Sequence, residues 1–209
     1  MHDNNIKKIP DCMGMERSGS TLAWQMASRA FDKRLNKTHE YIPGDSPGLY
    51  TYRNPIESFV SLLVRLDDVY PRSIAKSHAI KSIYLQTSIY TRLLEDYRNG
   101  RNIIFLKYED SYENPQSLLL QIIEGFNISI SQEGIDSILF ETSIEKNKKI
   151  SEGKNFGEVD DATQLHGNHI NPKSKGRPGF FIDNYSGIND LIKDERIIEL
   201  CDVFGYNLK

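Results

Sequence analysis

A short apolar segment that runs into a glycine-bounded loop constrains this fold more than any other feature. Residues 9–15 have the length and apolar character of a buried strand, and residues 14–21 read Gly-Met-Glu-Arg-Ser-Gly-Ser-Thr. A helical pattern follows from residue 22 to about residue 31. Because a loop between a strand and a helix N-terminus turns backbone N–H groups towards an anion, this segment predicts a phosphate site.

The loop departs from the usual nucleotide-binding loop at one position. Its spacing matches GxxxxGK[ST], but Ser20 stands where that pattern has lysine. Enzymes that cleave ATP use this lysine, together with Mg²⁺, at the β- and γ-phosphates. Here the nearby cation is Arg17 instead. An ordinary capped turn is the alternative interpretation, with Ser18 or Ser20 capping the helix.

The rest of the chain alternates between extended and helical patterns. Residues 103–106, Ile-Ile-Phe-Leu, are typical of a parallel strand covered on both faces. For 209 residues this pattern predicts a single α/β domain over residues 1–209, P-loop-like, with three α/β/α layers around a central parallel sheet. We expect further strands at residues 38–42, 49–52 and 102–108, and helices at residues 55–66, 80–97, 115–124, 132–140 and 188–204.

Residues 145–179 have a different character. They are rich in Lys, Asn, Gly and Asp, and their few core candidates are Ile150, Phe156, Val159 and Leu165. Structureless loops of this length are usually functional lids or disordered segments. We therefore expect a mobile lid over residues 145–179.

The charge and composition of the chain argue against some classes of binding partner. A net charge of −3, with basic residues that are not grouped with aromatic ones, argues against nucleic-acid binding. No segment approaches the roughly 20 apolar residues of a membrane span, and residues 1–8 lack the apolar core of a secretory signal. Cys12 and Cys201 are expected to be buried free thiols. We expect a cytoplasmic protein without a membrane partner.

Five segments in order resemble the sulfotransferases that use 3′-phosphoadenosine 5′-phosphosulfate (PAPS). Arg17-Ser18-Gly19-Ser20-Thr21 resembles the loop of this family that binds the 5′-phosphosulfate. Thr142 falls where the family often has a threonine that contacts adenosine. The other four segments are Lys37-Thr38-His39, Tyr52-Arg53-Asn54-Pro55 with Ser61, Leu106-Lys107-Tyr108-Glu109-Asp110 with Glu113-Asn114-Pro115, and Lys175-Gly176-Arg177-Pro178-Gly179.

The resemblance implies transfer of a sulfuryl group from PAPS to a hydroxyl or amine, with no metal. His39 would be the general base, and Arg17 would stabilise the charge on the leaving phosphate. The acceptor, which the resemblance does not identify, would be a sugar, a peptide or a small molecule. The residues that the resemblance assigns to the nucleotide are Arg17, Ser18, Gly19, Ser20, Thr21, Arg53, Ser61, Tyr108, Thr142, Lys175 and Gly176.

Residue chemistry supports this assignment and leaves alternatives. PAPS carries two separated anionic groups, and an arginine such as Arg53 can bind phosphate through two hydrogen bonds. Glu40 could take the proton in place of His39. His166 and His169 without a third ligand do not predict a metal site. The rival functions are a P-loop-like kinase or hydrolase, and a nucleotide-binding relative without catalysis.

The chain also departs from the family pattern. Arginine replaces the usual lysine at position 17, Ser174 replaces a common arginine, and Phe180 and Phe181 replace the usual Asp-Trp. Only 17 residues separate Thr21 from His39, and in the family this region helps to form the acceptor pocket. We therefore expect an open acceptor cleft.

Overall fold

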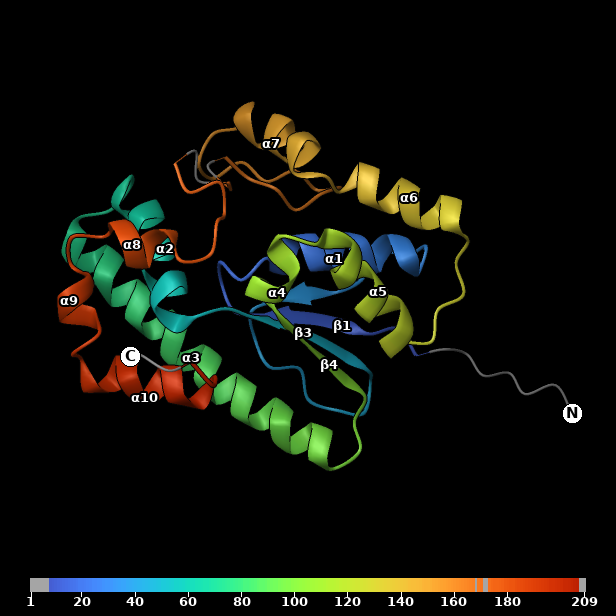
Figure 1. Ribbon diagram of the computed structural model, residues 1–209, viewed down its shortest axis with the longest axis horizontal. Helices are drawn as coiled ribbons and strands as arrows, with labels where there is room; N and C mark the ends of the chain where they lie inside the picture. Colours follow the sequence, from blue (N-terminus) through green and yellow to red (C-terminus); the bar gives the residue numbers. More distant parts are fainter. Residues whose placement is uncertain (1–7, 168, 171–172, 207–209) are drawn as a thin grey trace, which may run out of the picture.

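Four parallel strands form the centre of the molecule. The computed structural model describes residues 8–167, 169–170 and 173–206. Within them the strands pair in the order β2-β1-β3-β4, and every pairing is parallel (Figure 1). The expected central parallel sheet is therefore confirmed. The strands are β1 (Asp11–Gly14), β2 (Lys37–Thr38), β3 (Gly48–Tyr52) and β4 (Ile103–Lys107).

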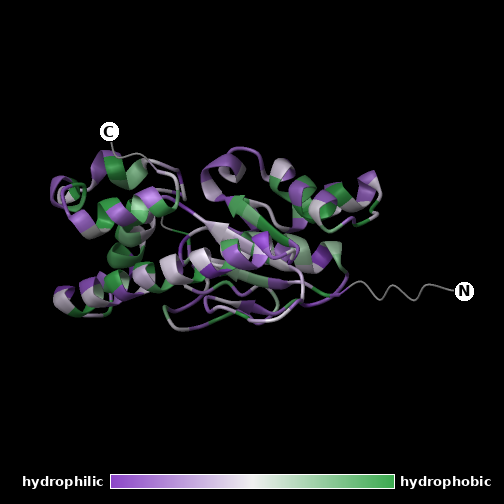
Figure 2. Cartoon of the chain, turned by 90° about the horizontal axis from the view of Figure 1, so that it is seen from below, coloured by the Kyte–Doolittle hydropathy of each residue, from purple (hydrophilic) through white to green (hydrophobic). Residues whose placement is uncertain are grey.

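Helices cover both faces of the sheet, which confirms the three-layer α/β/α class. Successive strand side chains point to opposite faces. Cys12, Leu49 and Leu106 belong to one apolar core, with residues of α1 (Ser20–Ala30), α5 (Pro115–Gly125) and α6 (Gln132–Glu141). The opposite core contains Met13 and Tyr50, with residues of α2 (Pro55–Asp67), α3 (Arg72–Arg98) and α10 (Glu195–Val203). Green and purple segments alternate along the helices in Figure 2, as expected for amphipathic helices.

The helix α2 begins where the sequence predicts it. The Asn54 side chain accepts hydrogen bonds from the backbone N–H groups of Ile56 and Glu57, and Pro55 occupies the first turn. An asparagine cap followed by proline is a favourable helix start. This start fixes the direction of the helix from the end of β3, next to Arg53.

Several boundaries differ from expectation. α3 starts at Arg72 rather than near residue 80, because its buried stripe continues through Ala75 and Ala79, which are too small to give a strong apolar signal. The single helix expected at residues 188–204 is split into α9 (Ile188–Leu191) and α10. β2 is only two residues long, so that residues 39–42 leave the sheet.

The expectation that residues 145–179 lack secondary structure is wrong for their first part. A helix, α7 (Ile144–Glu152), starts at Ser143, whose hydroxyl accepts from the Lys146 N–H. Its buried side chains, Asn147 and Ser151, are polar, so the sequence has no apolar periodicity that would predict this helix. Two further short helices were not expected, α4 (Tyr108–Tyr112) and α8 (Phe180–Asn184). Figure 1 places α7 above the sheet and α8 beside α2.

Both cysteines are buried free thiols, as the sequence predicts. Among the described residues, no helix is long and apolar enough to cross a membrane.

Candidate functional site

One predicted site residue follows the carboxyl end of each strand of the sheet. Arg17 follows β1, His39 follows β2, Arg53 follows β3, and Tyr108 follows β4. The chain passes from β1 to β2 on one side and then to β3 on the other side of β1. Ligands of parallel α/β sheets bind in the crevice at such a reversal of strand order.

The loop after β1 is not a capped turn. Arg17 and Gly19 both have left-handed backbone, with φ of 64° and 76°. The Ser18 hydroxyl donates to the Met15 carbonyl at 2.6 Å and also lies 2.7 Å from the Thr51 hydroxyl, which ties it to the sheet. Among the described residues, no side chain caps the N-terminus of α1. The first N–H groups of α1 therefore have no side-chain acceptor, as an anion site requires.

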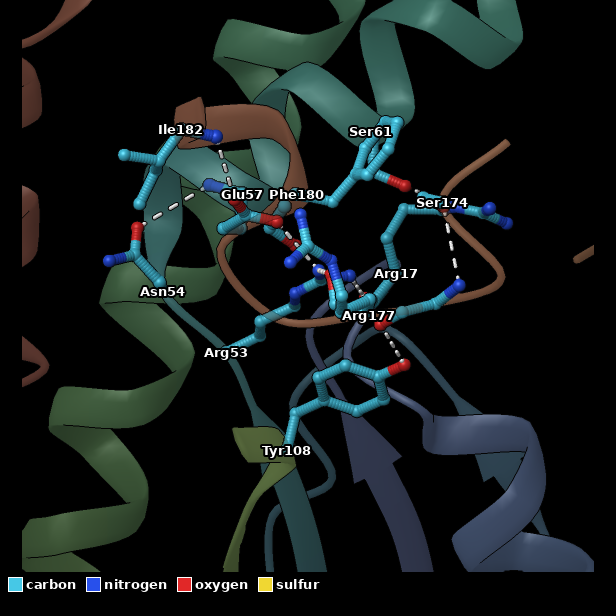
Figure 3. Close-up of polar contacts among 12 residues, drawn as sticks. Arg17, Arg53, Asn54, Glu57, Ser61, Tyr108, Ser174, Arg177, Phe180 and Ile182 are labelled. Atoms are coloured by element: carbon cyan, nitrogen blue, oxygen red, sulfur yellow. Dashed lines mark hydrogen bonds and ion pairs between the residues drawn. The ribbon is translucent and has the colours of Figure 1, made fainter. Parts of the chain in front are cut away.

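Arg17 lies at the centre of this region (Figure 3). Its Nε donates to the Ser61 hydroxyl at 3.1 Å, and its Nη2 donates to the His169 carbonyl at 3.1 Å. Burial, together with the charges of the nearby Arg65 and Arg53, lowers the pKa of Arg17 to about 10. Arg17 thus stays positively charged at neutral pH.

Arg53 is a second buried cation, with 3% of its surface exposed. Its Nη2 donates to the Glu57 carboxylate at 2.7 Å, and its guanidinium lies 4.5 Å from the centre of the Tyr108 ring. Its Nη1 donates to the Arg17 carbonyl at 3.4 Å, so that the two arginines are neighbours. The Arg53 Nε is buried and has no hydrogen-bond partner among the described residues.

Tyr108 joins the loop to the segment before α8. Its hydroxyl donates to the Gly176 carbonyl at 2.7 Å. A Cβ at Gly19 would lie 2.8 Å from Cδ2 of the ring, and a Cβ at Gly176, where φ is 83°, would lie 2.6 Å from the Tyr108 hydroxyl. Glycine is therefore required on both sides of Tyr108.

A cavity of about 680 Å³ collects most of the predicted nucleotide-binding residues. This volume is within the usual range for small-molecule sites. Ser20 is the one predicted member that does not line it. The predicted residues that do are Arg17, Ser18, Gly19, Thr21, Arg53, Ser61, Tyr108, Thr142, Lys175 and Gly176.

His39 lines a second cavity, of about 430 Å³. Its Nδ1 lies 2.6 Å from the Gly14 carbonyl. Because a carbonyl can only accept, Nδ1 carries the proton in the neutral ring, and Nε2 is left with a free lone pair. Glu40, the alternative base, also lines this second cavity and is exposed. Glu16 lines the second cavity and Arg17 the first, so that two consecutive residues form part of the wall between them.

Three polar residues near the site were not among the site residues predicted from the sequence. Lys37 donates to the Thr21 hydroxyl at 2.8 Å, and burial lowers its pKa to about 8. Glu57 pairs with Arg53, and their i, i+4 spacing is a signal that could have revealed it. His169 lines the first cavity, although no pattern in the sequence announces this position.

The two histidines considered as metal ligands bind each other. His169 Nδ1 lies 2.9 Å from His166 Nε2, and His166 Nδ1 lies 2.8 Å from the Gly167 carbonyl. Burial lowers the pKa of His166 to about 4 and that of His169 well below its usual range. In the part of the chain that the structure describes, no three His, Cys, Asp or Glu side chains come together as metal ligands.

Comparison with known proteins identifies the family. The model of the sulfotransferase domain matches residues 48–176, which is more than half of the chain. The chain belongs to the sulfotransferase domain family. The matched part of this sulfotransferase domain includes Arg53, Ser61, Tyr108 and Thr142, but neither the loop after β1 nor His39.

The fold of a solved sulfotransferase agrees. The crystal structure of mouse sulfotransferase SULT7A1 complexed with PAP superposes with a TM-score of 0.61 at 16% identity, and the match covers 93% of this chain and 84% of the mouse chain. At this identity the likeness shows a shared fold. No curated protein sequence matches the chain.

Proposed function

We propose that this sulfotransferase-family chain moves a sulfuryl group from PAPS to a hydroxyl or amine of an acceptor. The observation that carries the proposal is the pair of adjoining cavities. One holds the uncapped start of α1 with Arg17 and Arg53, and the other holds His39 with a free Nε2. The mouse relative crystallised with PAP, which is 3′,5′-ADP, the product that PAPS leaves behind.

The first cavity suits a nucleotide with two anionic ends. The N–H groups at the start of α1, together with Arg17, would hold the 5′-phosphosulfate. Arg53, Lys175 and Gly176 would hold the 3′-phosphate. The buried Arg53 Nε has no hydrogen-bond partner among the described residues, and a bound phosphate oxygen would supply one. Ser61, assigned to the nucleotide by resemblance, accepts from Arg17 and would therefore lie between the two anionic ends.

Transfer would be an in-line displacement at sulfur. The acceptor oxygen or nitrogen forms a bond to sulfur, the bond from sulfur to the bridging phosphate oxygen breaks, and 3′,5′-ADP leaves. The acceptor proton goes to His39 Nε2. The Gly14 carbonyl accepts from His39 Nδ1, which orients the ring and stabilises its charged form. Arg17 stabilises the charge that develops on the leaving phosphate.

The proposal gives residues 145–179 the role of a cover over the nucleotide. Three contacts support it, because carbonyls of this segment accept from the site residues. The His169 carbonyl accepts from Arg17, the Gly176 carbonyl from Tyr108, and the Arg177 carbonyl from Arg53.

A Mg²⁺-dependent kinase is less well supported. It needs a free carboxylate at a strand end, and the candidates are Glu109 and the exposed Asp110, which both follow β4. Both oxygens of Glu109 already take part in structural hydrogen bonds, since one accepts from the Asn54 N–H at 2.9 Å and the other from the Tyr206 hydroxyl at 2.6 Å.

Calorimetry tests the donor site directly. The purified chain is titrated with 3′,5′-ADP with and without EDTA, and with ATP–Mg²⁺ as the comparison. We expect metal-independent binding of 3′,5′-ADP and much weaker binding of ATP. Absence of 3′,5′-ADP binding contradicts the proposal, and tight binding of ATP–Mg²⁺ supports the kinase in its place.

A further inference from the structure

One helix face connects the two cavities. On α2 and its start, Arg53, Glu57, Ser61 and Arg65 follow one another at intervals of four residues, and such residues lie on one side of a helix. Ser61 lines the first cavity, whereas Arg65 lines the second, together with His39. Arg65 is therefore one turn beyond the nucleotide side, on the side of the proposed base.

Arg65 is a half-buried cation that pairs directly with no carboxylate among the described residues; burial lowers its pKa, and the charge of the nearby Glu16 partly opposes that shift. Among the described residues it makes no hydrogen bond or ion pair, and its Nε is buried without a partner. Two other buried arginines of this chain are paired, Arg53 with Glu57 at 2.7 Å and Arg101 with Asp96 at 2.8 Å. Because partial burial of an unpaired charge is costly, an unpaired Arg65 in a cavity wall indicates a site for an anion.

An aromatic ring contacts Arg65. Its guanidinium lies 4.9 Å from the centre of the Phe156 ring, and Phe156 lines the same cavity. This cation–π contact uses none of the guanidinium hydrogen bonds, so that the N–H groups of Arg65 remain available to a ligand. The geometry suits the two oxygens of a carboxylate.

The other walls of the second cavity define the rest of the ligand. Lys81 on α3 adds a second cation, while the carboxylates Glu16 and Glu40 come from the segments after β1 and β2. Glu16 accepts a hydrogen bond from Ser82. The apolar lining, from the helices α2 and α3 and the turn between them, suits the faces of a ring; it consists of Leu62, Leu66, Tyr70 and Leu85.

We propose that Arg65 binds a carboxylate of the acceptor, and that the acceptor is a small hydroxylated ring compound carrying that carboxylate. The ring packs on the apolar lining and the hydroxyl faces His39. A cavity of about 430 Å³ has room for a compound of this size. The inference rests on the proposed function and adds the chemical class of the acceptor.

Three phenols with one ring and different charges test the inference. The probes are 4-hydroxyphenylpropionate, its neutral amide, and the cationic tyramine, each assayed with PAPS. We expect the wild-type chain to favour the carboxylate over the amide by about 10- to 100-fold in kcat/KM, the usual worth of a charge-assisted hydrogen-bonded pair. Arg65→Gln should abolish this preference, and Arg65→Glu should shift it towards tyramine. Arg98→Gln, at an exposed arginine of α3, is the matched control and should keep the wild-type order.

Each contrary result has a distinct meaning. Equal use of the amide and the carboxylate by the wild-type chain overturns the inference. So does an equal loss of all three activities in Arg65→Gln, which would place Arg65 on the transferring sulfuryl group. If no phenol is sulfated, the acceptor class is wrong, and 3′,5′-ADP binding in the same preparation separates the outcomes: retained binding leaves the proposed function standing, and absent binding overturns both. Thermal melting of each variant confirms that it is folded.

Discussion

Substituting Gly19 by alanine should both destabilise the fold and damage the nucleotide cavity. Gly19 has φ of 76°, a left-handed conformation that costs an alanine about 1 kcal/mol. The new Cβ would lie 2.8 Å and 3.0 Å from two carbons of the Tyr108 ring, so the ring must move. Moving it sacrifices the hydrogen bond to Gly176, worth about 1 kcal/mol, and the stacking of Arg53, worth about 0.5–1 kcal/mol. We expect a loss of about 3 kcal/mol in the free energy of unfolding.

Gly179→Ala is the matched control, because Gly179 has φ of 77° and nothing within 4 Å of its Cβ position. It should show the backbone cost alone, about 1 kcal/mol. Both variants are compared by urea unfolding, and 3′,5′-ADP affinity is measured by calorimetry. In a Tyr108→Ala background, Gly19→Ala should cost no more than Gly179→Ala. If the two glycine variants lose the same stability in the native background, the reasoning about Tyr108 is refuted.

His39→Ala should lower kcat by about 10²- to 10⁴-fold and leave 3′,5′-ADP affinity nearly unchanged; equal losses of both would contradict its role as base. Glu57→Gln removes the negative charge that pairs with buried Arg53 and leaves one acceptor oxygen where Arg53 and the Ile182 N–H use two, so chemical unfolding should show a loss of about 3–5 kcal/mol; a neutral result would show that the pair is dispensable. The pKa values of His166 and His169 are depressed in the folded chain, so the unfolded chain binds more protons below about pH 6.5. The free energy of unfolding should therefore fall as the pH drops from 7 towards 5, by at most about 1.4 kcal/mol per pH unit for each ring. Melting temperatures of the double His→Gln variant should vary less with pH, and an unchanged slope would show that other groups cause the effect.

Much of the fold and of the nucleotide side could be predicted from the sequence because both depend on local patterns. The apolar run of β4 indicates a strand covered on both faces, and a parallel sheet brings the carboxyl ends of its strands to one edge. Arg17, Arg53 and Tyr108 each follow a strand directly, so their meeting at one cavity follows from topology.

The rest depends on contacts between distant segments. The buried side chains of α7, Asn147 and Ser151, are polar, so the helix could not be predicted from a periodic pattern of apolar residues. The hydrogen bond from Arg17 to the His169 carbonyl joins residues that lie 152 positions apart in the sequence. His39 belongs to a different cavity from Arg17, because its ring is drawn to the Gly14 carbonyl and residues 39–42 leave the sheet. No spacing in the sequence distinguishes one cavity from the other.

The four-residue interval on α2 has a consequence for how such a chain can diverge. A helix advances 1.5 Å and turns about 100° for each residue, so Ser61 and Arg65 are held about 6 Å apart along one rigid rod. Insertion of a single residue between them would swing Arg65 away from its cavity and leave Ser61 in place. A point substitution at position 65 can therefore change the lining of the second cavity while the first cavity keeps its residues. An insertion or deletion within α2 cannot make such a selective change, because it rotates every residue that follows it on the helix. The spacing Arg-x₃-Glu-x₃-Ser-x₃-Arg is thus a pattern by which relatives with the same pair of cavities can be sought from sequence alone.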